Sequence, residues 1–266
     1  MQFGDRSWVQ LGRATEEQPV VILPLGTTEA HGPGLPVDVD AHIVGHVARL
    51  VGERTSALVL PTLPYGYSST WLNYPGTVSL RAETLHEVLL DALESLVGQG
   101  FRTIFLLNGH RHNYSVMETV ARTAMDRHGL EHEDLLIATG SYWEIARDEI
   151  NALRRSELGG MAHACELETS LELAIRPELV DTEAIEDADR QIAAWDAGAA
   201  QPSVLVWRPW LRPDRHSGIV GDPTLASEES GRAFLEAIVT AVSEHVERLA
   251  RGESVDYYTQ PVAEDA

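Results

Sequence analysis

The chain has 266 residues, of which 44% are hydrophobic and 23% are charged, so it is long enough to bury a sizeable core. It carries 41 Asp and Glu residues against 20 basic residues, and the formal net charge of −21 argues against nucleic acid and anionic membranes as partners. Cys165 is the single cysteine, which excludes an intrachain disulfide and favours a reducing, cytoplasmic location. No signal-peptide pattern and no apolar run of about 20 residues is present.

In the first half of the chain, short apolar runs alternate with segments of helical periodicity. Residues 20–25 are predicted to form a buried strand that ends at Gly26, and residues 42–53 an amphipathic helix. A second strand is predicted over residues 57–63. A long helix is then expected from about Glu83 until Gly98 and Gly100 end it.

The alternation continues in the second half. Strands are predicted over residues 101–107 and 134–140, and helices over the segments 114–128, 166–175 and 228–249. This order predicts a three-layer α/β/α fold around a mostly parallel sheet. We expect a single domain over residues 1–252, a long structured loop over residues 195–222, and a loose tail from residue 253.

The first candidate site follows the first predicted strand. Residues 26–40 contain Glu29, His31 and Asp40 among several Gly and Pro residues, which indicates a rigid, irregular backbone. Ligands gather beyond the carboxyl ends of strands in open α/β sheets. Glu29 and His31 are two residues apart and point the same way in an extended segment, and carboxylate with imidazole suits Zn, Mn or Fe. The alternative is a polar loop in which Asp38 or Asp40 caps the next helix.

A second polar segment, residues 108–113, also connects a predicted strand to a predicted helix. His110 and His112 are therefore expected at the same edge of the sheet as the first segment. This convergence favours ligation by His110 over a purely structural role. Arg111 and His112 are expected to face solvent or substrate.

The third segment, residues 163–170, opens a predicted helix. His163 and Glu166 are three residues apart and are expected to share a face at the helix start. Glu168 and Glu172 are four residues apart and are consistent with a solvated acidic face. Three distant segments thus bring histidine and carboxylate groups to one edge of the sheet.

Together these segments resemble the creatininase (creatinine amidohydrolase) family. Its pattern is approximately G-[ST]-x-E-x-H-G-P-H-L-P-x-x-x-D, then N-G-H-x-x-N, then H-[AG]-G-E-x-E-T-S. The match extends from about residue 20 to about residue 241 and includes residues 75–77, 141–143 and 217–223. The resemblance implies a creatininase-like α/β fold, a site for two divalent metal ions, and a homo-oligomer, commonly a ring-like hexamer.

The resemblance assigns five side chains to two ions of Zn, Mn or Fe: Glu29, His31, Asp40, His110 and Glu166. Glu29 and His110 would hold one ion and His31 the other, with Asp40 bridging them. In creatininase itself, the remaining ligand is a Glu two residues after the His of the N-G-H segment. That position is His112 here. Many other members of the family instead offer the Glu of the H-[AG]-G-E segment, which is Glu166 here, so the resemblance predicts that Glu166 completes the second site, with His112 as the alternative.

Further positions depart from the family pattern or match it in informative ways. Gly34 replaces a His and is expected to alter the substrate pocket. Cys165 replaces a Gly, which is interpreted as a packing change. Trp143 matches a Trp that covers the substrate in creatininase, although a core aromatic is the alternative. Trp71 and Arg111 are candidates for a flat wall and an anion contact.

The resemblance also implies a mechanism. Two cations about 3.5–4 Å apart can share a bridging hydroxide, which attacks a carbonyl carbon while a metal ion polarises the carbonyl oxygen. His163 is predicted to be the catalytic acid that protonates the leaving nitrogen, because imidazole changes charge near physiological pH. The alternative is that His163 only hydrogen-bonds a ligand carboxylate.

The predicted function is hydrolysis of a carbon–nitrogen bond in a small cyclic or formyl-bearing amide. A peptidase and a cyclic-ketone hydrolase are the alternative enzymes, and a non-catalytic metal-binding scaffold is the alternative outside catalysis. Creatinine itself is not expected as the substrate, because its hydrolysis in the family goes with a Glu at the position of His112.

Overall fold

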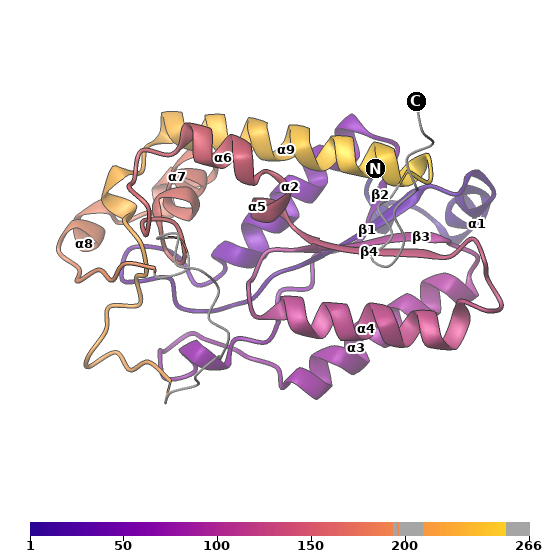
Figure 1. Cartoon of the computed structure of the whole chain (residues 1–266), viewed down its shortest axis with the longest axis horizontal. Helices are drawn as coiled ribbons and strands as arrows, with labels where there is room; N and C mark the ends of the chain where they lie inside the picture. Colours follow the sequence, from indigo (N-terminus) through magenta and orange to yellow (C-terminus); the bar gives the residue numbers. More distant parts are fainter. Residues whose placement is uncertain (194–195, 197–209, 254–266) are drawn as a thin grey trace, which may run out of the picture.

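The computed structural model describes residues 1–193, 196 and 210–253. Within them, four strands form one parallel sheet in the order β2-β1-β3-β4 (Figure 1): β1 (Val20–Leu25), β2 (Leu58–Val59), β3 (Thr103–Asn108) and β4 (Leu136–Ser141). Strands β1 and β3 pair along their whole length and finish side by side, with Leu25 opposite Asn108. The predicted α/β fold class is confirmed. The carboxyl ends of the two central strands, β1 and β3, lie next to each other.

The second strand is much shorter than the predicted segment 57–63. After Val59 the chain keeps contact with β1 only through isolated hydrogen bonds, such as Leu60 N–H to Ile22 O at 2.9 Å. Pro61 and Pro64 follow, and proline has no N–H to donate to a neighbouring strand. Regular pairing therefore ends at Val59.

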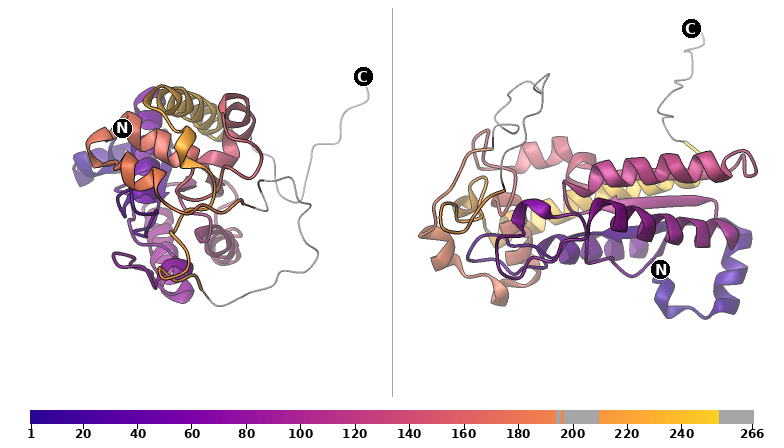
Figure 2. Two further views of the ribbon diagram at one scale, coloured as in Figure 1. Left: turned by 90° about the vertical axis from the view of Figure 1, so that its left-hand side faces the viewer. Right: turned by 90° about the horizontal axis from the view of Figure 1, so that it is seen from below.

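Helices cover both faces of the sheet (Figures 1 and 2). One face carries α2 (Val39–Arg54) and α9 (Glu228–Ala250), and the other carries α3 (Ala82–Gly98) and α4 (Asn113–His128). Strand β1 is buried on both faces because its side chains alternate. Val20 and Ile22 pack in the core beside α2 and α9, whereas Val21, Leu23 and Leu25 pack in the core beside α3 and α4.

The remaining helices are shorter than α2, α3, α4 and α9. Helix α7 (Glu166–Ile175) agrees with the predicted bounds and packs against α9, and α5 (Tyr142–Ile145), α6 (Arg147–Leu153) and α8 (Thr182–Glu186) are short. Helix α1 (Trp8–Glu17) has no predicted counterpart. It begins with a capping box of Ser7 and Gln10, and Leu11 and Ala14 on it are half-buried against the core beside α3 and α4.

Two glycines let the first turn of α2 pass very close to the ends of β1 and β3. A Cβ at Gly26 would lie 2.3 Å from the Cα of Ala41, and a Cβ at Gly109 would lie 2.6 Å from the carbonyl oxygen of Asp40. Both distances are far below van der Waals contact, and the atoms met are backbone. The sheet edge and the start of α2 are therefore in direct backbone contact.

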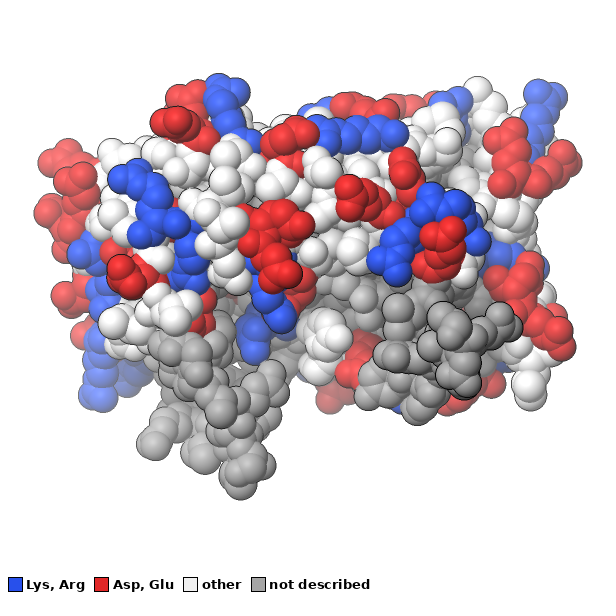
Figure 3. All heavy atoms as spheres, turned by 45° about the horizontal axis from the view of Figure 1, so that its top comes forward, with Lys and Arg blue, Asp and Glu red and all other residues white. Residues whose placement is uncertain are grey.

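The charged surface of the described residues is mixed. On the face that carries α9, acidic and basic side chains lie interspersed (Figure 3), with pairs such as Arg54 and Glu236. No helix among the described residues is both long and apolar enough to cross a lipid bilayer. Residues 254–266 of the predicted tail, and residues 195 and 197–209 of the predicted loop, lie outside the described residues.

Candidate metal centre

Three segments converge beyond the carboxyl ends of the strands, as the sequence predicts. The loop after β1 carries Glu29 and His31, the first turn of α2 carries Asp40, β3 leads to His110, and the first turn of α7 carries Glu168. All five side chains are buried. They form two groups whose potential ligand atoms lie within 4.8 Å of one another: Glu29, Asp40 and His110, and His31, Asp40 and Glu168.

Asp40 belongs to both groups and lies between the two histidines. Its Oδ1 is 3.2 Å from Nε2 of His31, and its Oδ2 is 2.9 Å from Nδ1 of His110. The hydroxyl of Thr27 donates a hydrogen bond to Oδ2. Asp40 lies in the first turn of α2, where the helix dipole stabilises its negative charge. The alternative of a capping role is not observed for Asp38, which holds the N-cap position without a capping hydrogen bond.

Glu29 contacts the same ring nitrogen of His110 as Asp40 does. Its Oε1 is 3.2 Å from Nδ1 of His110, and its Oε2 accepts a hydrogen bond from the hydroxyl of Ser68. Ser68 and Thr27 therefore fix the orientation of two carboxylates. Neither is among the predicted site residues, because a hydroxyl that hydrogen-bonds a carboxylate across the fold leaves no pattern in the sequence.

Glu168, not the predicted Glu166, lies in the cluster. Both carboxylate oxygens of Glu166 accept backbone hydrogen bonds, from the N–H of Arg155 at 2.8 Å and of Ser156 at 2.7 Å. Glu166 thus holds the loop before His163 and has no oxygen directed to the other ligands. Glu168 is buried with its Oε1 4.0 Å from Nε2 of His31, so the alternative of a solvated acidic face is also excluded for Glu168.

The other residues predicted near the site lie outside these groups. His112 packs edge-to-face against His110, with ring centroids 5.3 Å apart, and burial lowers its pKa to about 4. Trp143 packs against Tyr142 and the hydrophobic core beside α2 and α9, which agrees with the core-aromatic alternative. Burial raises the pKa of the Cys165 thiol to about 12, so this thiol stays protonated.

The buried carboxylates of the cluster favour positive charge close to them. Burial alone would lower the pKa of His31 and His110, but the neighbouring carboxylates outweigh it and raise both values to about 10. Burial raises the pKa of Glu168 to about 7, with His31 opposing the shift. In the metal-free protein, protons on the two histidines therefore balance the buried carboxylates.

Unpaired polar atoms point to the same conclusion. Among the described residues, Oε1 of Glu29, Nε2 of His31 and Oε2 of Glu168 are buried in the cluster without a hydrogen-bond partner. Leaving such atoms unpaired costs about 1–3 kcal/mol each. Oxygen and imidazole donors of this kind fit Zn, Mn or Fe, and a divalent cation would satisfy them in place of the protons.

We expect metal binding to release protons and to strengthen as pH rises. The pKa values of His31 and His110 are raised from 6.5 to about 10, so at pH 7 both rings are protonated before the metal enters. Titration calorimetry in buffers of different ionisation enthalpy measures the number of protons released. Apparent affinity should increase from pH 6 to pH 9, and an affinity independent of pH would contradict this electrostatic account.

His163 lies beside the cluster in a stack of rings. Its ring centroid is 4.3 Å from that of His31 and 4.1 Å from that of Trp71, and the rings of His163 and Trp71 are nearly parallel, at 14°. Its Nε2 lies 2.9 Å from the carbonyl oxygen of Ala30, and its Nδ1 lies 3.4 Å from Oε1 of Glu29. A carbonyl can only accept a hydrogen bond, so Nε2 carries a proton and Nδ1 faces the cluster.

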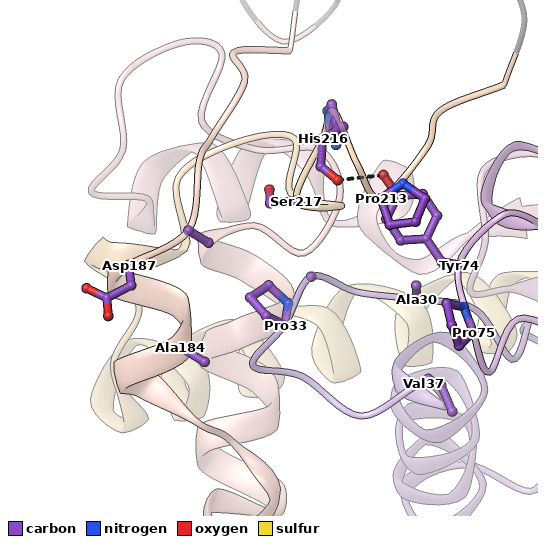
Figure 4. Close-up of a pocket in the computed structure, with 12 residues that line it drawn as sticks. Ala30, Pro33, Val37, Tyr74, Pro75, Ala184, Asp187, Pro213, His216 and Ser217 are labelled. Carbon is purple, nitrogen blue, oxygen red and sulfur yellow. Dashed lines mark hydrogen bonds between the residues drawn. The ribbon is translucent and has the colours of Figure 1, made fainter.

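A cavity of about 500 Å³ opens beside the loop that carries the ligands (Figure 4). Ala30 and Pro33 line it from that loop, and Tyr74 and His216 also line it, where the Tyr74 hydroxyl donates a hydrogen bond to the carbonyl oxygen of His216. Gly34 is not among the residues that line this cavity. A Cβ there would lie 2.4 Å from a side-chain carbon of Ile185, so α8 already fills the space.

Comparison with known proteins identifies the family of this chain. The family model described as "Creatininase: Creatinine amidohydrolase" matches residues 4–246. The chain belongs to the creatininase family.

Creatinine amidohydrolase of Pseudomonas putida is 30% identical, with 91% of this chain and 95% of that protein aligned. A solved creatinine amidohydrolase superimposes with a TM-score of 0.80 at 30% identity, covering 93% of this chain and 96% of the other. The predicted family is confirmed.

Relatives with other named reactions match over similar lengths. A mycofactocin precursor peptide peptidase of Mycobacterium ulcerans is 31% identical, with 91% of each chain aligned. A 3-dehydro-scyllo-inosose hydrolase of Thermotoga maritima is 26% identical, over 94% of this chain and 82% of that protein. All of these names denote hydrolases, so this creatininase-family chain is an enzyme with hydrolase activity.

Proposed function

We propose that this enzyme uses two divalent metal ions to hydrolyse a carbon–nitrogen bond in a small amide. The observation that carries the proposal is the pair of buried ligand groups that share Asp40. Glu29, Asp40 and His110 would hold one ion, and His31, Asp40 and Glu168 the other. Solved creatininases described as a manganese form and as a Zn–Zn type support Zn or Mn, and Fe suits the same donors. When bound, two such ions would acidify a water molecule and polarise a carbonyl group.

The protein supplies the remaining chemistry through His163. Breaking a carbon–nitrogen bond requires a proton on the departing nitrogen. His163 has Nε2 engaged by the carbonyl of Ala30, so Nδ1, which faces Glu29 and the cluster, is the atom that takes up a proton and delivers it. Burial lowers the pKa of His163 well below its usual value, as expected for a ring that gives up its second proton readily.

The proposed substrate class is a cyclic or formyl-bearing amide other than creatinine. Creatinine is excluded because residue 112 is a histidine here, whereas creatininase has a Glu at this position. Peptide cleavage and cyclic-ketone hydrolysis are the second candidates, favoured by the names of the peptidase and inosose hydrolase relatives. A proton-delivering His163 is needed for a nitrogen leaving group, which favours the amide class and the peptide over the ketone.

A substrate panel tests the proposed reaction. Lactams, cyclic imides, formamides, short peptides, inosose-type ketones and creatinine are incubated with Zn- or Mn-loaded enzyme, with metal-free enzyme as the control. We expect turnover of an amide that depends on added metal. Turnover confined to ketones would contradict the amide proposal, and efficient turnover of creatinine would contradict the exclusion.

We also propose a homo-oligomer, a hexamer as the family resemblance implies, and a cytoplasmic location. The buried, isolated Cys165 supports a reducing compartment, since nothing in the sequence requires an oxidising one. Light scattering at micromolar concentration should give a mass six times that of one chain. A monomer mass would contradict the proposed assembly.

A further inference from the structure

Trp71 holds the ring of His163 from the side opposite the metal ligands. It ends the short 3-10 turn η2 (Ser69–Trp71) in the segment between β2 and α3. The near-parallel stack at 4.1 Å covers one face of His163, while His31 covers the other at 4.3 Å and 35°. A ring confined between two flat neighbours cannot turn about its Cβ–Cγ bond without displacing one of them.

The backbone of His163 is fixed as well. Its N–H donates to the carbonyl of Val220 at 2.8 Å, and the N–H of Val220 donates back at 2.9 Å. Val220 also packs against the cluster formed by Ala30, Trp71 and Tyr74. Val220, which holds the main chain of His163, and Trp71, which stacks on its ring, therefore pack in the same apolar cluster.

Trp71 is itself held rigidly. It is only 4% exposed, Tyr74 packs edge-on against it at 5.5 Å, and the N–H of Tyr74 donates to its carbonyl at 2.9 Å. The residue before its turn is Ser68, whose hydroxyl contacts Glu29. One short turn of chain therefore contacts a ligand carboxylate at one end and the acid–base ring at the other.

We propose that Trp71 is a positioning residue for His163. Its indole face keeps Nε2 of His163 on the carbonyl of Ala30 and Nδ1 towards the cluster, and it excludes water from that face of the ring. Loss of the face lets the imidazole rotate, so that Nδ1 is no longer aimed at the departing nitrogen. The proposal rests on the proposed amide hydrolysis for its kinetic consequence, but the positioning itself is a property of the fold.

The kinetic experiment compares Trp71→Leu, Trp71→Phe and Trp8→Leu in the Zn-loaded enzyme, with ring-substituted formanilides as substrates. Trp71→Leu should lower kcat about 10²-fold with little change in KM, as misplacement of a catalytic group does. The loss should grow as the leaving aniline becomes more basic, because a basic leaving group depends most on the proton from His163. Trp71→Phe keeps a flat face and should retain most of kcat. Trp8→Leu makes the same change at a residue that is 82% exposed and should match the wild type.

A second measurement does not depend on turnover. Nitrogen-15 NMR of histidine-labelled, Zn-loaded enzyme reports which ring nitrogen of His163 carries the proton. We expect a single Nε2–H form in the wild type and in Trp71→Phe, and exchange between the two tautomers in Trp71→Leu. Metal content measured on the same samples should stay equal to that of the wild type.

The outcomes separate the two proposals. An unchanged His163 spectrum in Trp71→Leu, or a loss of kcat that is equal for all leaving groups, would overturn the role of Trp71. If the wild type hydrolyses no formanilide or other amide, the proposed function fails, and the NMR comparison alone decides whether Trp71 positions His163. Loss of metal from Trp71→Leu would show that it supports the ligands instead, which also overturns the proposal.

Discussion

Changing Glu168 to Gln is expected to remove about one of two metal ions per chain and most of the activity. Glu168 is the carboxylate that accompanies His31 and Asp40, and its Oε2 is buried with no hydrogen-bond partner. An amide is a much weaker ligand for a divalent cation than a carboxylate, so the second ion loses an essential donor. Elemental analysis after reloading with Zn or Mn measures the stoichiometry directly.

Two variants serve as matched controls. Glu166→Gln makes the same change two residues earlier and should keep both ions. It should lower the free energy of unfolding by about 1–3 kcal/mol, because its new NH₂ group would face a backbone N–H of Arg155 or Ser156. His112→Ala should also keep both ions. A loss of metal from Glu166→Gln or His112→Ala, with Glu168→Gln intact, would show that the second site is built differently.

Changing His163 to Ala is expected to lower kcat by about 10²- to 10⁴-fold, the usual contribution of a general acid or base. Metal content should not change, because each ion has three other protein ligands in the proposed arrangement. Activity assays and metal analysis on the same preparation check both statements.

The metal measurement makes this test decisive. Glu29, His31 and His163 also offer atoms within 4.8 Å of one another, so the geometry permits His163 to act as a ligand. Loss of one ion from His163→Ala would favour ligation over proton transfer. Retention of metal with full activity would contradict both roles.

Much of the site follows from the sequence because parallel strands place their carboxyl ends together. The strands ending at Leu25 and Asn108 are apolar and unambiguous, so Glu29, His31, Asp40 and His110 are predicted near one another, and the structure brings them together. Their convergence needs no knowledge of side-chain contacts. The family resemblance adds which of them would share an ion.

The third segment is harder to predict because its geometry changes between His163 and the helix. Ala164 adopts a left-handed conformation with φ of 49°, and α7 begins only at Glu166. The rule that residues three apart share a helical face therefore does not apply to His163 and Glu166. Glu166 turns back to the loop before it, and Glu168 takes the place at the cluster, a choice that only the backbone path reveals.

Trp71 also shows a limit of sequence reasoning. Its aromatic side chain is recognisable as a candidate pocket wall, but its stacking on His163 depends on a segment about 90 residues away in the chain. Stacked rings contributed by separate loops leave no periodicity and no fixed spacing. Contacts of this kind appear only when the tertiary structure is known.

The close backbone approach at Gly26 and Gly109 has a consequence for how this enzyme can diversify. The main chain around Asp40 packs against both strand ends, so backbone contacts hold the carboxylate that both proposed metal sites share. A change that moved Asp40 would have to deform the sheet itself. New substrates must therefore be accommodated by the loops around a fixed reaction centre.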